Sequence, residues 1–321
     1  MGNKKIAISS FWPLPAELLE RIKNAAPGYE LLDLGSNPTD AQLTECEIMF
    51  GSVVKPEQIN KMINLKWAHA QTAGVESYLN PEAKLPENLV LTNSSGAFGV
   101  AIAEYMLTVT LMLLRNARGY ITNQQQELWQ PLGNALNIYG SRVAVIGMGD
   151  IGGRYAQICH ALGASVCGVV RSPRAEKPSY VDELLTTEQI DEAIKNADVV
   201  ALALPGTGET AGVLSRQRLL AMKKGAVIVN VGRGSAIDQD ALIELLQNGH
   251  LGGAGLDVTT PEPLPKGNPL WLLPNVVLTP HTSHGGRDNT SELIIGKFLR
   301  YLKDYLNGNP FERVVDKGAG Y

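Results

Sequence analysis

A glycine-rich hexapeptide in the middle of the chain is the feature that most constrains its fold. The stretch GMGDIG at residues 147–152 places Gly147, Gly149 and Gly152 in the spacing G-x-G-x-x-G. It overlaps the end of VAVIG (residues 143–147), an apolar stretch with the length of a buried strand, and it opens a segment with helical periodicity. A strand, a tight turn and a helix in this order are typical of a loop that binds the pyrophosphate of a dinucleotide.

Each position of this motif has a physical reason. Gly147 allows the tight turn, Gly149 lets the backbone approach a phosphate, and Gly152 lets the helix pack closely on the strand. Asp150 and Ile151 begin the helix, where backbone N–H groups and the positive end of the helix dipole attract phosphate. We therefore predict that all five residues bind a dinucleotide. The alternative is a glycine turn with a structural role only.

The rest of the chain alternates short apolar strands with helices, which predicts parallel sheets joined by right-handed crossovers. Strands are expected in a first series at residues 5–9, 29–34, 48–51, 65–71 and 89–92. A second series is expected at residues 143–147, 165–170, 199–204, 226–231, 253–257 and 276–279. A helix at residues 99–115 is apolar on nearly every side, which predicts burial or contact with a second subunit. The last helix, residues 290–307, could belong to either series.

Composition excludes several classes of partner. The 321 residues are enough for two domains, and 28 basic against 32 acidic residues give a net charge of −4. Such a chain has no electrostatic attraction for nucleic acid or an anionic membrane. The longest apolar run, residues 105–114, is about half the roughly 20 residues of a membrane span.

The cysteines and the start of the chain bear on localisation. Cys46, Cys159 and Cys167 lack metal-binding spacing, and their odd number argues against a disulfide framework. The first ten residues, MGNKKIAISS, lack the apolar core and cleavage site of a signal peptide. We therefore expect buried, reduced thiols in a cytoplasmic protein.

The end of the strand after the glycine motif bears on the choice of cofactor. NAD sites usually place an acidic residue there to bind the ribose 2′-hydroxyl. Here the strand ends at Val170 and is followed by Arg171 and Ser172. A guanidinium beside a hydroxyl suits a 2′-phosphate, so NADP is predicted to be preferred over NAD. The alternative is a solvated basic loop that stacks on adenine without discriminating between the two.

Three segments that follow later strands carry candidate catalytic residues. Arg233 lies in NVGRG, Glu262 in LDVTTPEPLP and His281 in TPHTS. Hydride transfer to a carbonyl requires a proton donor that works near neutral pH, and histidine is the natural choice. A carboxylate fixes its tautomer, and arginine binds a substrate carboxylate in a bidentate manner. We predict His281 as the acid/base, Glu262 as its partner and Arg233 as the substrate clamp.

On these motifs the chain resembles the D-isomer-specific 2-hydroxyacid dehydrogenases, in particular the glyoxylate/hydroxypyruvate-reductase-like members. The resemblance covers essentially the whole chain. It rests on GMGDIG (147–152), ALPGTGET (203–210), NVGRG (230–234), LDVTTPEPLP (256–265) and TPHTS (279–283). The catalytic Arg, Glu and His of the family fall on Arg233, Glu262 and His281.

The resemblance implies two Rossmann-like parallel-sheet domains, with the cofactor domain inserted into a flavodoxin-like substrate domain. The substrate domain would comprise residues 1–98 and 289–321, and the NAD(P)-binding domain residues 99–288. The resemblance also implies a homodimer held by the helix at residues 99–115 and the stretch through Trp129.

Further site residues are implied by position in the family motifs. Ala73 and Gly74, in the loop QTAGV, would bind the substrate carboxylate through backbone N–H groups, with Val54 beside them. The positions implied to line the cofactor are Pro205, Thr210, Val231 and Asp257.

The expected reaction is reduction of a small 2-oxo acid by NAD(P)H to the D-2-hydroxy acid. The alternatives are an NAD-dependent D-lactate- or D-3-phosphoglycerate-type dehydrogenase and a dinucleotide-sensing binding protein. Two features depart from the family pattern: the missing acidic residue near Arg171, and His284 three residues after His281. No metal is expected, because this histidine pair lacks a third ligand nearby.

Overall fold

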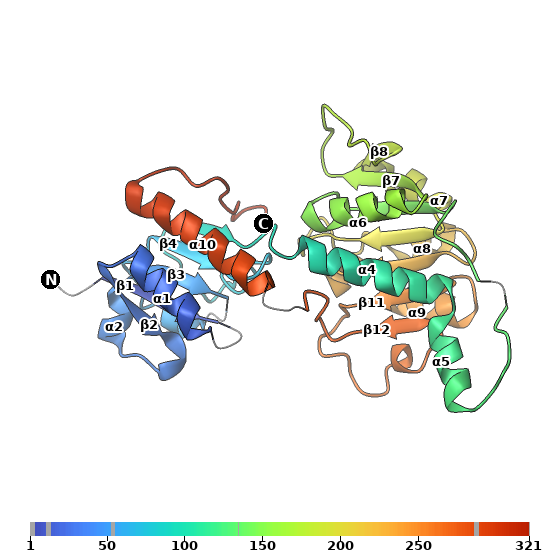
Figure 1. The fold of residues 1–321 in the computed structure, drawn as a ribbon, viewed down its shortest axis with the longest axis horizontal. Helices are drawn as coiled ribbons and strands as arrows, with labels where there is room; N and C mark the ends of the chain where they lie inside the picture. Colours follow the sequence, from blue (N-terminus) through green and yellow to red (C-terminus); the bar gives the residue numbers. More distant parts are fainter. Residues whose placement is uncertain (1–3, 11–13, 53–54, 134, 286–288, 321) are drawn as a thin grey trace. The chain divides into compact units, whose positions relative to one another are not determined.

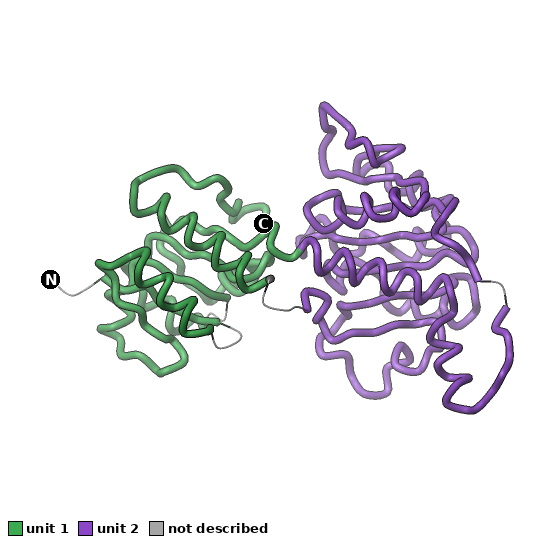
Figure 2. The backbone as a smooth tube through the Cα atoms, viewed as in Figure 1, with its two compact units in different colours: residues 1–98, 286–321 green, residues 99–285 purple. Residues whose placement is uncertain are grey.

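The protein, described here from a computed structural model, forms two compact units (Figure 2). Unit 1 comprises residues 1–98 and 286–321, and unit 2 comprises residues 99–285. The structure describes residues 4–10, 14–52, 55–133, 135–285 and 289–320. Within them lie a five-stranded and a seven-stranded sheet, and all strand pairs are parallel. The prediction of an α/β protein with two parallel sheets is confirmed.

The sheet of unit 1 has the strand order β2-β1-β3-β4-β5, which is the flavodoxin-like order. Its strands are β1 (Lys4–Ser9), β2 (Tyr29–Asp33), β3 (Cys46–Gly51), β4 (Trp67–Ala70) and β5 (Val90–Asn93). β3 and β4 are buried throughout, as expected for inner strands of a parallel sheet covered on both faces. Its helices are α1 (Ala16–Ala25), α2 (Asp40–Thr44), α3 (Pro56–Ile59) and α10 (Asn289–Asn307).

The last helix, α10, packs on the sheet of unit 1 (Figure 1). The ring of Phe298 stacks on Trp67 of β4 with centroids 5.2 Å apart, and it contacts Phe50 of β3 at 4.6 Å. Arg21 of α1 and Glu292 of α10 form an ion pair at 2.7 Å. The chain therefore returns to unit 1 after completing unit 2, so unit 1 is discontinuous in sequence.

The sheet of unit 2 has the order β12-β11-β10-β9-β6-β7-β8, the doubly wound Rossmann order extended by one strand. Its strands are β6 (Arg142–Ile146), β7 (Ser165–Val170), β8 (Glu183–Thr186), β9 (Val199–Leu202), β10 (Val227–Asn230), β11 (Gly253–Leu256) and β12 (Val276–Leu278). The order reverses beside β6, and open α/β sheets bind ligands at the carboxyl ends of the strands next to such a point.

The helices of unit 2 are α4 (Gly99–Leu114), α5 (Ala117–Gln125), α6 (Asp150–Ala161), α7 (Ile190–Lys195), α8 (Arg216–Ala221) and α9 (Gln239–Gln247). β8 lies outside the strands predicted from the sequence. Its four residues, ELLT, form a half-buried edge strand with only one β-branched residue, so their pattern carries little β signal.

The apolar helix α4 lies directly on its own sheet. A Cβ atom at Gly255 would come within 2.9 Å of Val109, and one at Gly253 within 2.9 Å of Leu113. The glycines of β11 thus allow helix and strand to approach closely. Much of the apolar surface of α4 is therefore covered by its own sheet. Among the described helices, none alone is long and apolar enough to cross a membrane; only α4 and α5 together pass that test, with a 65° bend between them.

Candidate active site

The glycine-rich turn connects β6 to α6 and is shaped by close backbone contacts. Gly147 has φ +99°, and a Cβ atom there would lie 2.6 Å from the carbonyl oxygen of Ala203. A Cβ atom at Gly152 would lie 2.0 Å from the oxygen of Gly147, whereas one at Gly149 would meet nothing within 4 Å. Gly149 also precedes α6 without a side-chain cap. The turn therefore leaves open space where a phosphate can reach the start of the helix.

The side chain of Asp150 is directed toward other parts of unit 2. One carboxylate oxygen accepts a hydrogen bond from Nε of Arg154 at 2.8 Å. The other is buried without a hydrogen-bond partner among the described residues, and a Cβ atom at Gly99 would come within 2.1 Å of it. The Asp150 carboxylate thus lies against the start of α4, while Ile151 is half-buried in the first turn of α6.

Arg171 follows β7 and reaches the loop that follows β9. Its guanidinium pairs with the carboxylate of Glu209 at 2.9 Å, and both side chains are more than half exposed. Since β7 and β9 flank β6, this ion pair connects the loops on the two sides of the glycine-rich turn. Ser172, also exposed, adjoins it. Neither Glu209 nor the ion pair was predicted, because residues of two distant loops meet there.

Arg174 is a second cation at the turn that the sequence analysis did not select. Its Nη2 donates a hydrogen bond to the carbonyl oxygen of Met148, inside the glycine motif, at 2.8 Å. The signal for it was present in the same basic stretch, RSPR at residues 171–174. Arg174 therefore ties the end of β7 to the glycine-rich turn.

The loops after β9 and β10 pack closely against each other. Thr210 accepts a hydrogen bond from the Thr207 N–H at 3.0 Å and donates to the carbonyl oxygen of Pro205 at 2.7 Å, so it closes its own loop. Val231 is buried, and a Cβ atom at the next residue, Gly232, would lie 2.5 Å from a backbone oxygen of the β9 loop. These contacts fix the conformation of the loops that follow β9 and β10.

The structure brings His281 and Glu262 together. Nδ1 of His281 lies 2.9 Å from one carboxylate oxygen of Glu262, and the other oxygen accepts the Thr259 N–H at 3.1 Å. Both side chains are partly exposed, at 46% and 39%. Nε2 of His281 has no partner among the described residues. The imidazole is thus oriented by a carboxylate on one side and available to a ligand on the other.

Arg233 lies just beyond the carboxyl end of β10. In the sheet β10 pairs with β11, and β11 pairs with β12. Glu262 follows β11 in the sequence, and His281 follows β12. It is half-buried, and its Nη1 donates to the carbonyl oxygen of Gly232 at 2.8 Å. A Cβ atom at Gly206 would come within 2.9 Å of the Arg233 side chain, so the glycine leaves room for it. The three predicted catalytic residues therefore follow three neighbouring strands at one edge of the sheet.

Asp257, which the resemblance implied to line the cofactor, is engaged by the turn that carries His281. Its side chain is buried, and its carboxylate accepts hydrogen bonds from Oγ1 of Thr279 at 2.6 Å and from the N–H groups of Thr282 and Ser283 at 2.9 Å and 3.0 Å. Both carboxylate oxygens are thereby engaged by the turn that carries His281.

His284 lies half-buried near this turn. Burial lowers its pKa, the charge on His281 lowers it further, and Asp257 opposes the shift. Within the described part of the chain, no group of three or more His, Cys, Asp or Glu side chains could hold a metal ion.

The family of the chain follows from a sequence comparison. The family described as D-isomer specific 2-hydroxyacid dehydrogenase, NAD binding domain, matches residues 107–283. The chain belongs to this family. It is an NAD(P)-dependent oxidoreductase of the 2-hydroxyacid dehydrogenase type, and the matched residues contain the glycine-rich turn, Arg233, Glu262 and His281.

This dehydrogenase is similar to three known proteins over most of its length. It is 27% identical to glyoxylate/hydroxypyruvate reductase B of Serratia proteamaculans, covering 95% of this chain and 97% of that one. It is 31% identical to D-3-phosphoglycerate dehydrogenase of Methanocaldococcus jannaschii over 94% of this chain, but spans only 53% of that relative. A solved structure of NADPH-dependent glyoxylate/hydroxypyruvate reductase from Sinorhizobium meliloti, in complex with NADP and sulfate, superposes with a TM-score of 0.85 at 26% identity, covering 99% of this chain and all of that one.

The predicted substrate loop of the dehydrogenase follows β4 in unit 1. Nδ2 of Asn93 donates to the carbonyl oxygen of Ala73 at 2.7 Å, and the Thr72 hydroxyl donates to that of Gly74 at 2.6 Å. The N–H groups of Ala73 and Gly74 donate to no other described residue. The loop is thus held through its carbonyl groups, which leaves two N–H groups for an anion. Val54 lies outside the described residues.

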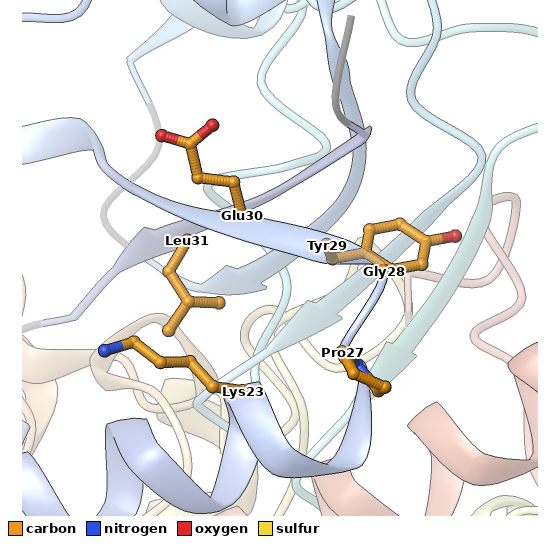
Figure 3. Close-up of a pocket in the computed structure, with 6 residues that line it drawn as sticks. All are labelled: Lys23, Pro27, Gly28, Tyr29, Glu30 and Leu31. Atoms are coloured by element: carbon orange, nitrogen blue, oxygen red, sulfur yellow. The ribbon is translucent and has the colours of Figure 1, made fainter.

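A pocket of about 390 Å³ in unit 1 is separate from all the predicted site residues (Figure 3). It lies between the end of α1 and the beginning of β2, whereas the substrate loop follows the carboxyl end of β4. Its lining residues are Lys23, Pro27, Gly28, Tyr29, Glu30 and Leu31.

Proposed function

We propose that this dehydrogenase reduces a small 2-oxo acid, of the glyoxylate or hydroxypyruvate type, to the D-2-hydroxy acid. The observation that carries the proposal is the contact between His281 and Glu262, which leaves Nε2 of His281 without a partner among the described residues. A nicotinamide cofactor, when bound, supplies the hydride that is added to C2 of the substrate. Protonated His281 donates the Nε2 proton to the carbonyl oxygen as negative charge develops there.

Glu262 and Arg233 have supporting roles in this proposal. The Glu262 carboxylate holds the proton on Nδ1 and stabilises the imidazolium before the proton is transferred. Arg233 binds the substrate carboxylate and polarises the adjacent carbonyl group. The N–H groups of Ala73 and Gly74 are proposed as a further anion-binding group for a substrate carboxylate. Each group thereby favours a planar 2-oxo acid with a carboxylate next to the carbonyl.

The residues of the glycine-rich turn fit a dinucleotide. The open space at Gly149 and the uncapped start of α6 suit a pyrophosphate, since the first backbone N–H groups of a helix bind anions. We propose that residues 99–288 form the cofactor domain, and that residues 1–98 and 289–321 form the substrate domain. Pro205, Thr210, Val231 and Asp257 would line the bound cofactor, and Asp257 also holds the turn that carries His281.

NADP is the proposed preferred cofactor. Arg171 and Ser172 follow β7 directly and are proposed to recognise a 2′-phosphate, since no acidic residue takes their place there. The Glu209 carboxylate already pairs with Arg171, so a 2′-phosphate would have to replace it. A phosphate dianion competes well here, because an exposed pair of this kind contributes only about 0.2–1 kcal/mol. The Sinorhizobium meliloti relative, whose structure contains NADP, supports the same choice.

The reaction is tested with a panel of glyoxylate, hydroxypyruvate, pyruvate, 2-oxoisocaproate and phenylpyruvate, each offered with NADPH and with NADH. Oxidation of the reduced nicotinamide is followed by absorbance. Fastest turnover of NADPH with glyoxylate or hydroxypyruvate is the expected result. NADH preference would favour a D-lactate- or D-3-phosphoglycerate-type enzyme, and cofactor binding without any turnover would favour a dinucleotide sensor.

A homodimer is proposed from the surface around α5. Trp129 is fully exposed, and Ile121, Leu128 and Leu136 are each about half exposed. Leu128 and Trp129 line one pocket together with Tyr120, and exposed apolar surface of this kind marks protein contacts. Light scattering during gel filtration tests the prediction, and twice the 34.5 kDa chain mass is expected.

The three cysteines are buried and free, which fits the proposed cytoplasmic location.

A further inference from the structure

A hydrogen-bonded chain connects α4 to the turn that carries His281. The Tyr105 hydroxyl of α4 lies 2.6 Å from Oγ1 of Thr279, and Oγ1 of Thr279 lies 2.6 Å from the Asp257 carboxylate. Because the carboxylate can only accept, Thr279 donates to Asp257 and Tyr105 donates to Thr279. Burial raises the pKa of Tyr105 to about 12, so its phenol retains the donor proton.

The hydrogen-bonded chain ends at the turn that carries His281, and this turn has an unfavourable backbone conformation. His281 has φ +53°, in the left-handed region that side chains other than glycine seldom adopt. Such a residue persists only where its surroundings fix it. Here its N–H donates to the backbone oxygen of Asp257 at 2.8 Å, while the Asp257 carboxylate binds the N–H groups of Thr282 and Ser283. Asp257 therefore clamps the turn on both sides of the imidazole.

We propose that Tyr105 is a positioning residue that acts through Thr279 and Asp257 to hold the His281 imidazole at the angle needed for proton transfer. The hydrogen bonds from Tyr105 through Thr279 fix the Asp257 carboxylate. The carboxylate in turn fixes the backbone from which His281 projects. This inference rests on the proposed function of His281 as the acid. Removing the Tyr105 hydroxyl leaves the glycine-rich turn and Arg171 untouched, so it affects the chemical step more than cofactor binding.

The protein offers a matched control, a second tyrosine hydroxyl that contacts α4 from another helix. The Tyr155 hydroxyl of α6 lies 2.7 Å from Oγ1 of Thr110 in α4, and Thr110 donates in turn to a backbone oxygen. Tyr155 is fully buried, so this is also a tyrosine–threonine hydrogen bond in the interior of unit 2. It has no connection to Asp257 among the described residues. Tyr155→Phe therefore removes a comparable hydroxyl without touching the His281 turn.

The experiment compares full-length wild type, Tyr105→Phe and Tyr155→Phe. Three quantities are measured: kcat and KM for the best 2-oxo acid, the Kd of NADPH from fluorescence, and amide hydrogen exchange by mass spectrometry. For Tyr105→Phe we expect kcat to fall about ten-fold, with the Kd of NADPH within about two-fold of wild type. Exchange should accelerate in peptides that cover residues 279–285 and remain unchanged in the other strands of unit 2. Tyr155→Phe should leave both kcat and the exchange of residues 279–285 unchanged.

Variants at Thr279 test the middle of the chain. Thr279→Ser keeps the hydroxyl and should retain the wild-type kcat and the wild-type exchange of residues 279–285. Thr279→Val removes the hydroxyl and should lower kcat and accelerate this exchange as Tyr105→Phe does. A purely structural role would lower thermal stability without this separation between kcat and cofactor binding.

The outcomes separate the inference from the proposed function. Unchanged kcat and unchanged exchange of residues 279–285 in Tyr105→Phe would overturn the inference. Equal acceleration of exchange across all of unit 2 would also overturn it, because the chain would then act only in general packing. If wild type turns over no 2-oxo acid, the proposed function fails, and the exchange of residues 279–285 in Tyr105→Phe against Tyr155→Phe still decides whether Tyr105 positions the turn.

Discussion

The carboxyl ends of the two sheets are stabilised by different interactions, and each contains a histidine. In unit 1, His69 of β4 is fully buried, and its two ring nitrogens lie 2.7 Å and 3.1 Å from the hydroxyls of Thr92 and Ser94. In unit 2, His281 is partly exposed, pairs with a carboxylate through one nitrogen and leaves the other to a ligand. The same side chain therefore packs in one unit and is available for chemistry in the other.

The two environments also differ in how the backbone is used. Around His69 the contacts are made by side chains, including the rings of Phe50, Trp67 and Phe298. In unit 2, Gly147, Gly152 and other glycines let loops approach each other closely and leave an open edge. Side-chain packing yields a closed interior, whereas close backbone approach at the glycine-rich turn leaves open space beside Gly149.

Substitution of His281 is expected to have the largest effect. His281→Ala should lower kcat roughly a thousand-fold, because it removes the proton donor, and should leave the Kd of NADPH within about two-fold. Turnover by absorbance and cofactor binding by fluorescence measure the two quantities. His69→Ala is the contrasting variant: it should reduce stability far more than kcat. Near-native turnover of His281→Ala would contradict the assigned role.

The glycine-rich turn offers a matched pair of variants. Gly152→Ala places a methyl group 2.0 Å from a backbone oxygen. We therefore expect the unfolding free energy to fall by roughly 3 kcal/mol. NADPH binding should weaken as well. Gly149→Ala meets no atom within 4 Å and has an ordinary φ of −81°, so it should fold normally while weakening NADPH binding. Denaturant unfolding and fluorescence titration provide the measurements. Equal stability of the two variants would show that steric contact does not define this turn.

The buried histidine predicts a pH dependence of stability. Burial, assisted by the charge of Lys297, lowers the pKa of His69 to about 3. The unfolded chain therefore binds a proton at this residue below its ordinary pKa of about 6.5, and stability falls as the pH decreases through that value. From pH 7 to pH 5 the loss should be about 2 kcal/mol in unfolding free energy.

Denaturant titrations at several pH values measure this slope. His69→Gln should flatten it. A slope that persists in His69→Gln would assign the effect to other groups.

The smallest expected effect concerns cofactor choice. Glu209→Gln removes the carboxylate that competes for Arg171, so NADPH should bind about two- to five-fold more tightly, with little change for NADH. Arg171→Asp should abolish the preference for NADPH, and adding Glu209→Gln to it should have no further effect on NADPH binding. The ratio of kcat/KM for the two cofactors is the measurement. An unchanged ratio in Arg171→Asp would remove Arg171 from the recognition of the 2′-phosphate.

The extent to which the site could be predicted from the sequence differs from residue to residue. The glycine motif was visible because its spacing records local steric needs, and Glu262 and His281 were visible because their types suit one reaction. Tyr105 had no signal, since one tyrosine in an apolar helix resembles any other core residue. Its hydrogen-bond partner, Thr279, is 174 residues away.

The amino-acid sequence by itself determined the alternation of strands and helices, the strand–turn–helix unit with the glycine motif and the residue types available for chemistry. These depend on periodicity and on contacts between near neighbours along the chain. The return of α10 to unit 1 was implied by the family resemblance and not by any local pattern. Tertiary structure alone decided that Glu209 pairs with Arg171 and that Asp257 holds the turn that carries His281. Such contacts join distant segments, and their geometry is set by the strand order of the sheet, which no local pattern encodes.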